Sequence, residues 1–193
     1  DYTLSPALSI IDITRELQDS TPADITFVIL SGWRMEEIAA SLPTSGLEIT
    51  PEAFIAAAQT PPQVLAFASP VTMEGFFYPD TYILPRTTTV EQLLDVIARN
   101  FVQHLTEDLT TGFTNQGLTL NQAVIVASIV EREAIQPEES SLIASVYLNR
   151  LAINMKLDAD PTVQYAAGFN VEQSTWWTNP LRAVDLDINS RFN

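Results

Sequence analysis

The feature that most constrains this chain is an apolar segment with a clear start and two carboxylates at its end. Thr119-x-x-Gln122 is a capping box, in which two side chains bond the free backbone N–H groups at the start of a helix. Residues 123–130 (A-V-I-V-A-S-I-V) are apolar on nearly every side, which is typical of a helix buried inside its domain. Glu131 and Glu133 follow. The pattern therefore predicts a buried helix that ends in two acidic side chains.

The two carboxylates are not expected to share a proton. Residues two positions apart are rotated by about 200° around a helix, so Glu131 and Glu133 point to different sides. A carboxyl group at the edge of an apolar environment has a raised pKa, because desolvation disfavours its charged form, and this suits a general acid. The competing interpretation is that both are helix-end carboxylates paired with Arg132, Arg150 or Arg182. Periodicity alone does not say which of the two glutamates faces a cleft.

Composition restricts the partners and the chemistry. The formal net charge is −15, and such a surface repels phosphate backbones and anionic headgroups, so we expect no nucleic-acid partner. Cysteine is absent, which excludes disulfides, thiolate zinc sites and a cysteine nucleophile. His104 is the single histidine, which excludes a multi-histidine metal site. Lys156 is the single lysine, so a Schiff base could form there alone.

Local patterns predict an α+β fold. The alternation of strand and helix signals within residues 1–45 indicates a small α/β module, for which a plain packing scaffold is the competing interpretation. Residues 71–82 are rich in aromatic side chains, and residues 152–193 are rich in turn formers. We expect a strand at 24–30 and helices within 4–17 (after a strand end at Leu4 and a turn), 31–42, 51–59, 64–68, 89–105, 119–136, 138–151 and, as a last turn, 180–186.

The chain carries no recognisable membrane or export segment. No run approaches the roughly 20 apolar residues that a spanning helix needs. No signal peptide is visible, and the chain does not begin with methionine. We therefore expect a soluble portion of a longer protein, which would meet a membrane only through an anchor absent from this chain.

Four short motifs occur in order along the chain. They are E-G-F-F-Y-P-D-T-Y at 74–82, A-S-I-V-E-R-E at 127–133, N-R-L at 149–151 and D-P-T-V-Q-Y at 160–165. With this order and spacing, the chain resembles the endolytic murein transglycosylase (YceG-like) family over nearly its whole length. The resemblance implies a LysM-like module at 1–45, a helical connector at 46–70 and a mainly helical catalytic domain with short strands at 71–193.

The resemblance also implies a reaction and a site. By position, Glu133 is the catalytic acid and Glu131 is structural. The reaction is non-hydrolytic cleavage of the β-1,4 bond between N-acetylmuramic acid and N-acetylglucosamine, which leaves a 1,6-anhydro end and needs no metal or organic cofactor. From the residues themselves, Asp160-Pro-Thr162 could be a polar turn that binds substrate, or simply a turn with a side-chain cap. The candidate substrate-binding residues in these motifs are Asp80, Tyr82, Asn149, Asp160, Thr162, Gln164 and Tyr165.

The resemblance further implies a setting at the outer face of the bacterial cytoplasmic membrane, with a single-pass anchor upstream. The expected partners are peptidoglycan strands and cell-wall synthases. Ser190-Arg-Phe-Asn193 matches only the start of the segment that follows in the family, so we expect a C-terminally truncated domain. Trp176 and Trp177 are candidates either for stacking on sugars or for a core or interface role.

Three other functions are compatible with the residues to different degrees. The chain could be a glycan-binding module without activity, or a scaffold for cell-wall synthases. A pyridoxal-phosphate lyase is disfavoured, because Lys156 lies in a polar turn and the six glycines form no phosphate-binding loop.

Overall fold

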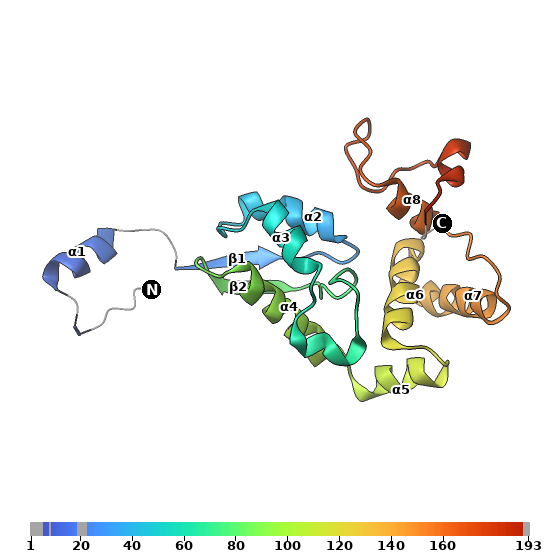
Figure 1. Cartoon of the computed structure of the whole chain (residues 1–193), viewed down its shortest axis with the longest axis horizontal. Coiled ribbons are helices and arrows are strands. Elements are labelled where there is room, and N and C mark those ends of the chain that lie inside the picture. The colour runs from blue at the N-terminus through green and yellow to red at the C-terminus, as the bar shows by residue number, and fades with distance from the viewer. Residues whose placement is uncertain (1–5, 8, 19–22, 191–193) are drawn as a thin grey trace.

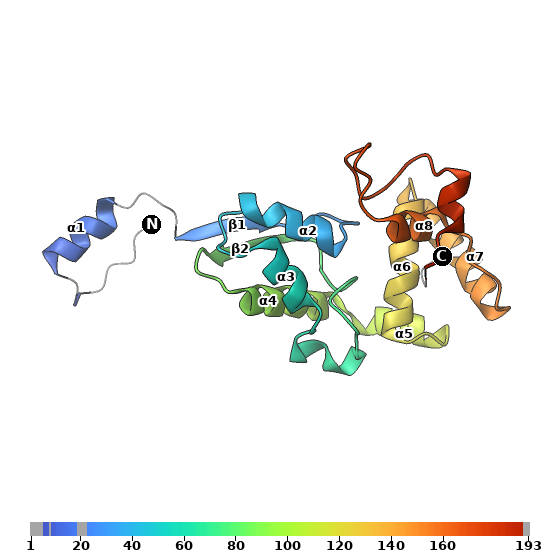
Figure 2. The same cartoon turned by 45° about the horizontal axis from the view of Figure 1, so that its top comes forward.

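The computed structural model describes residues 6–7, 9–18 and 23–190. Helix α1 (Ile10–Gln18) confirms the helix expected within 4–17, and it lies apart from the other elements in Figures 1 and 2. The strand end expected at Leu4 lies outside the described residues. No helix in the described part of the chain is long and apolar enough to cross a membrane.

The first unit is built on a two-stranded antiparallel sheet. Strand β1 (Asp24–Val28) pairs with β2 (Thr81–Pro85) along its whole length. Every second residue of each strand is buried, so only one face of the sheet is covered. Helices α2 (Met35–Ser41), α3 (Pro51–Ala58) and α4 (Val90–His104) share a hydrophobic core with that face.

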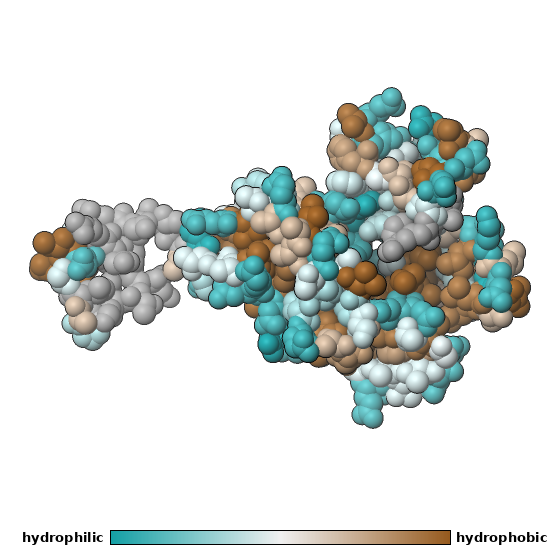
Figure 3. Space-filling view, viewed as in Figure 1, coloured by the Kyte–Doolittle hydropathy of each residue, from teal (hydrophilic) through white to brown (hydrophobic). Residues whose placement is uncertain are grey.

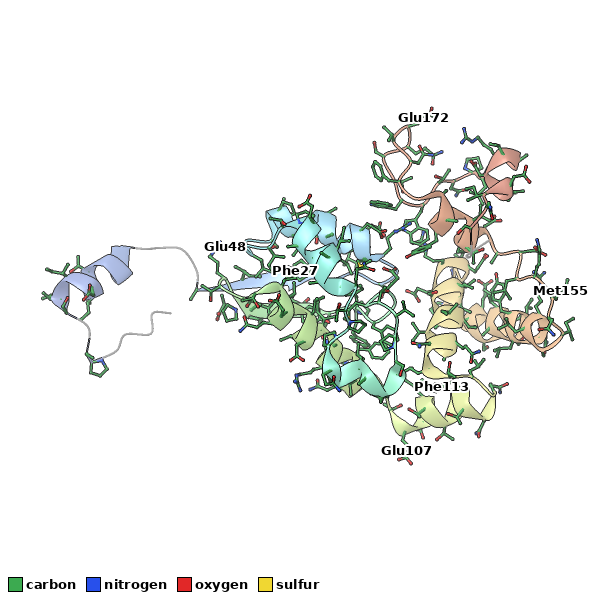
Figure 4. The ribbon with its side chains drawn as sticks, viewed as in Figure 1. Phe27, Glu48, Glu107, Phe113, Met155 and Glu172 are labelled. Carbon is green, nitrogen blue, oxygen red and sulfur yellow. The ribbon has the colours of Figure 1, made fainter. Side chains whose placement is uncertain are left out.

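The first core runs across both predicted domain boundaries. Phe27 of the predicted module, Leu65 of the predicted connector and Leu93 of the predicted catalytic part are all fully buried in it. Figure 4 labels Phe27 among the side chains that fill this unit. One continuous core occupies residues 25–102 and shows no break at either predicted boundary. The division into domains at residues 45 and 70 stays a prediction.

The second unit is helical. It consists of α5 (Glu107–Asn115), α6 (Leu120–Glu133), α7 (Ser140–Ala152) and α8 (Asp160–Ala167). Val126, Ile129 and Val130 of α6 form its small core with residues from α7 and the turn before α8. The polar turn expected at 160–162 was wrong, because Pro161 occupies the first turn of α8, where its missing N–H costs nothing. Short 3₁₀ helices occupy Leu42–Thr44, Gln63–Ala68, Pro137–Glu139 and Ala183–Asp187.

Helix α6 joins the two units. Leu120 and Val124 pack against the first core, whereas Val126 contributes to the second. The capping box that opens the helix is confirmed: Thr119 N–H donates to Gln122 Oε1, 2.9 Å away. The expectation that α6 is buried on all sides was wrong, since the side chain of Ile125 is 58% exposed. Figure 3 shows apolar surface on the side of the molecule where α6 and α7 lie.

Gly75 lies where the segment before β2 crosses α6. A Cβ atom at this position would come within 2.7 Å of Val124 Cγ1, and its φ of +84° is unfavourable for other residues. We predict that Gly75→Ala lowers the free energy of unfolding by more than about 2 kcal/mol, from steric overlap added to backbone strain. Gly117→Ala is the matched control, because Gly117 has a φ of +72° but open space around it.

Urea unfolding of the two variants measures this difference. We expect Gly117→Ala to cost only about 1 kcal/mol, which is the strain alone. Equal losses in both variants would contradict close packing of this segment on α6.

Candidate active site

Glu133 is the last residue of α6, and it lies against α7. Its carboxylate is half-buried, and Oε1 accepts a hydrogen bond from the Tyr147 hydroxyl at 3.1 Å. Burial, followed by the negative charge of Glu133, raises the pKa of Tyr147 to about 12. The Tyr147 hydroxyl therefore keeps its proton at neutral pH and is a donor to the carboxylate.

Other charged side chains surround this pair where α6, α7 and α8 meet. The charge of Arg150 lowers the pKa of Tyr147, and the charge of Asp160 raises it. Arg150 itself donates to the Leu157 carbonyl in the turn before α8. Asp160 also lines an open cavity of about 480 Å³ between the start of α8 and residues 186–190. Glu133 and Asp160 are thus placed at one helical junction.

Glu131 faces the opposite side, as predicted. Its side chain is exposed and lies beside Gly32, in the loop after β1. Among residues 23–190, neither Glu131 nor Glu133 forms an ion pair with an arginine, so the interpretation as helix-end ion pairs is not supported. Arg182 instead pairs with Asp185 at 3.1 Å.

The residues predicted on α8 are engaged within the protein. Thr162 Oγ1 donates to the Ala159 carbonyl, and Gln164 Nε2 donates to the Thr178 carbonyl at 2.9 Å. The Tyr165 ring lies under the guanidinium of Arg34, whose Cζ is 4.1 Å from the ring centroid. Their contact with a sugar stays a prediction.

The structure does not bring the remaining predicted residues to this junction. Asn149 is exposed, and it lies two positions beyond Tyr147 on α7, so it points away from Glu133. The side chains of Asp80 and Tyr82 both bond Asn100 of α4. The hydrogen bond from Asn100 is the main cause that lowers the pKa of Asp80, whereas burial raises the pKa of Tyr82.

Asp80 and Tyr82 line a second open cavity, of about 370 Å³, between β2 and α4. It shares no lining residue with the cavity beside Asp160. Figure 1 shows β2 and α4 on the opposite side of α6 from α7. If both cavities contact a glycan, they contact different parts of it.

An arginine that the sequence did not reveal connects the two units. Arg34, at the start of α2, is only 6% exposed and bonds Glu36 at 2.7 Å. Its guanidinium stacks on Tyr165 and on Trp176, at 4.1 and 4.7 Å from the ring centroids. Its Nη1 also donates to the Tyr165 carbonyl. No local pattern marks Arg34 as a contact between the units, because its aromatic partners, Tyr165 and Trp176, lie far along the chain.

A second cation–π contact supports the same junction. The Arg132 guanidinium lies 3.8 Å from the centroid of the Trp177 ring, and Trp177 Nε1 donates to Glu37 of α2 at 3.0 Å. Trp176 packs edge-on against Phe169. These contacts favour the interface role for the two tryptophans over stacking on sugars.

Glu74 is a half-buried carboxyl group at the same place. Its Oε2 accepts from the Met35 N–H at 3.0 Å, which fixes the segment before β2 to the start of α2. Burial raises the pKa of Glu74 from 4.5 to about 7, with smaller contributions from the charges of Glu36 and Glu37. The hydrogen bond from Met35 and the charge of Arg34 act in the opposite direction. A metal site is a separate question. In the described residues, no group of three histidine or acidic side chains could hold a metal ion.

Comparison with known proteins identifies the family to which this chain belongs. The profile of the YceG-like family matches residues 1–193, which is the whole chain. The chain belongs to the YceG-like family. An endolytic murein transglycosylase of Streptococcus pneumoniae D39 is 28% identical over 218 residues, which cover 100% of this chain and 39% of that protein. One of Bacillus subtilis 168 is 29% identical over 122 residues, which cover 63% of this chain and 32% of that protein.

A solved structure agrees with the fold. The crystal structure of a YceG-like protein from Listeria monocytogenes matches with a TM-score of 0.75 at 25% identity. The match covers 100% of this chain and 66% of that one. This YceG-like chain therefore spans about two-fifths of the length of the pneumococcal relative and about two-thirds of the Listeria structure.

The raised pKa of Glu74 predicts that the stability of this YceG-like chain depends on pH. Between pH 4.5 and about 7, the folded state holds a proton that the unfolded state has released, so the free energy of unfolding falls as pH rises. We predict that Glu74→Gln removes about 2–3 kcal/mol of this fall. Urea unfolding across the pH range measures it.

The control is Glu48→Gln, because the Glu48 side chain is exposed. It should keep the wild-type slope. Parallel pH curves for wild type and Glu74→Gln would contradict the burial of a protonated carboxyl group.

Removal of the buried Arg34 charge is predicted to lower the free energy of unfolding strongly. Arg34→Met keeps an apolar side chain but removes the charge, so Glu36 and the two aromatic rings lose their partner. We expect the free energy of unfolding to fall by about 2–4 kcal/mol and tryptophan emission to shift to longer wavelength. Urea unfolding followed by fluorescence measures both.

Arg99→Met is the matched control. Arg99 also pairs with a carboxylate, Asp95, at 2.6 Å, but its side chain is 62% exposed. We expect an unchanged midpoint and unchanged emission. A wild-type midpoint in Arg34→Met would show that the two units do not depend on this contact.

Proposed function

We propose that this chain carries the catalytic acid of a peptidoglycan lytic transglycosylase that cuts glycan strands internally. The observation that carries the proposal is the single half-buried carboxylate at the end of α6, Glu133, with its tyrosine donor, in a chain whose relatives are named endolytic murein transglycosylases. The substrate is the β-1,4 bond between N-acetylmuramic acid and N-acetylglucosamine. Cutting within nascent strands would terminate them.

The proposed reaction uses one carboxyl group twice. Protonated Glu133 gives its proton to the glycosidic oxygen as the bond from that oxygen to the muramyl C1 breaks. The muramyl 6-hydroxyl then bonds C1 and returns its proton to the Glu133 carboxylate. The products are a 1,6-anhydro-muramyl end and a free 4-hydroxyl, and no water is consumed. This differs from ordinary glycosidases, which use two carboxylates.

The site is consistent with one working carboxylate. Glu131 points to the first unit, so it is not a second member of a pair. Asp160 lies at the same junction as Glu133, and in a hydrolytic mechanism it would be the second carboxylate. The nature of the product therefore separates the two mechanisms.

We further propose the setting that the family resemblance implies. The site works on the outer face of the bacterial cytoplasmic membrane, held by a single-pass anchor outside this chain, beside cell-wall synthases. The LysM-like character of the N-terminal part and its hold on the glycan belong to the same proposal. The strongly acidic chain, with a net charge of −15, would be held away from anionic lipid headgroups.

The test compares Glu133→Gln with wild type in the full-length protein. Peptidoglycan is digested, and the products are identified by mass spectrometry. We expect anhydro-muramyl ends from wild type and roughly a 100-fold or greater loss in Glu133→Gln, because a side-chain amide has no acidic proton to donate. Glu131→Gln is the matched control on the same helix and should keep wild-type activity.

The other outcomes each have a meaning. Reducing ends in place of anhydro ends would make the protein a hydrolase and direct attention to Asp160. Glycan binding without cleavage in both wild type and variant would favour a binding module. Full activity in Glu133→Gln would refute the assignment of the acid.

A further inference from the structure

Tyr147 is a buried residue with one polar atom, and that atom contacts the candidate acid. Its side chain is 7% exposed and packs in the second core with Val126, Ile129 and Val130 of α6. The hydroxyl donates to Glu133 Oε1 at 3.1 Å. The ring is therefore held by apolar contacts from the helix that carries the acid, and only its hydroxyl reaches the carboxylate.

We propose that Tyr147 is a positioning residue, which selects the carboxyl oxygen of Glu133 that transfers protons. The inference rests on the proposed function. Because Oε1 accepts the hydrogen bond from Tyr147, the acid proton resides on Oε2. Oε2 then gives the proton to the glycosidic oxygen and receives the proton of the muramyl 6-hydroxyl. Without this bond, the carboxyl group can rotate and can carry its proton on either oxygen.

The charges around Tyr147 are consistent with a donor role. The raised pKa of its hydroxyl, about 12, leaves it protonated at neutral pH, so it is not itself the base. Arg150 is engaged with the Leu157 carbonyl, and Asp160 is an acceptor when charged. Among the residues that the structure describes, Tyr147 is the side chain that donates a hydrogen bond to Glu133.

A purely structural role for Tyr147 makes a different prediction. If the ring only fills the core, phenylalanine would serve equally well, because it occupies the same apolar space without a hydroxyl. Tyr147→Phe is therefore the decisive substitution. Tyr78→Phe is the matched control, since Tyr78 is half-buried and its ring stacks on His104, with the ring centroids 3.9 Å apart.

The experiment measures cleavage of uncrosslinked glycan strands by the full-length protein across a pH range. We expect Tyr147→Phe to lower kcat about 10-fold with KM unchanged, because the proton is misplaced but the glycan still binds. The alkaline limb of the kcat profile should move to higher pH, because the charged carboxylate has lost a donor. Tyr78→Phe should match wild type in both.

Thermal unfolding of each variant is measured in parallel, and kcat is normalised to the folded fraction. Partial unfolding lowers kcat but does not move the alkaline limb. A wild-type kcat and limb in Tyr147→Phe, with Glu133→Gln inactive, would overturn the positioning role and leave the proposed function standing. Activity in Glu133→Gln would overturn both.

Discussion

The buried guanidinium of Arg34 is the contact on which the arrangement of the two units depends. A charged group that is 6% exposed must be paired, since leaving it alone in the interior costs several kcal/mol. Its partners come from both units: Glu36 from α2, and Tyr165 and Trp176 from the region of α8. The position of Arg34 therefore constrains the distant C-terminal residues to lie against the first unit.

This constraint determines where Glu133 lies, because α6 is shared between the units. One side of α6 packs on the first core, and Arg132 near its end stacks on Trp177, which in turn bonds Glu37 of α2. Another side contributes to the second core, which holds Tyr147. With two of its sides fixed, the end of α6 presents Glu131 and Glu133 to different environments. A helix that belonged to only one unit would leave the direction of its last turn much freer.

Local signals predicted most helices but not the contacts between them. Capping boxes marked the starts of α4 and α6, because a cap bonds backbone within its own turn. Strand β2 was missed, since its partner β1 lies far away in sequence and its aromatic, proline-containing approach resembles a loop. Helix α5 was also missed: it buries no residue, and its threonines and Gly112 have low helix propensity. The choice of Glu133 over Glu131 came from family resemblance, whereas the roles of Arg34 and Tyr147 depend on contacts between distant segments, which local sequence patterns do not show.

The motif E-G-F-F-Y-P-D-T-Y shows why a motif does not by itself mark a binding surface. Its first residue, Glu74, bonds the start of α2, and its second, Gly75, lets the chain approach Val124 of α6 more closely than any side chain would permit. This dipeptide therefore fixes three segments to one another: the approach to β2, the start of α2 and the helix that carries Glu133. Burial of the Glu74 carboxyl group disfavours its charged form, whereas the hydrogen bond from the Met35 N–H favours that form. The first two positions of the motif are thus accounted for by the packing that sets the direction of α6, whereas substrate contact at Asp80 and Tyr82 stays a prediction.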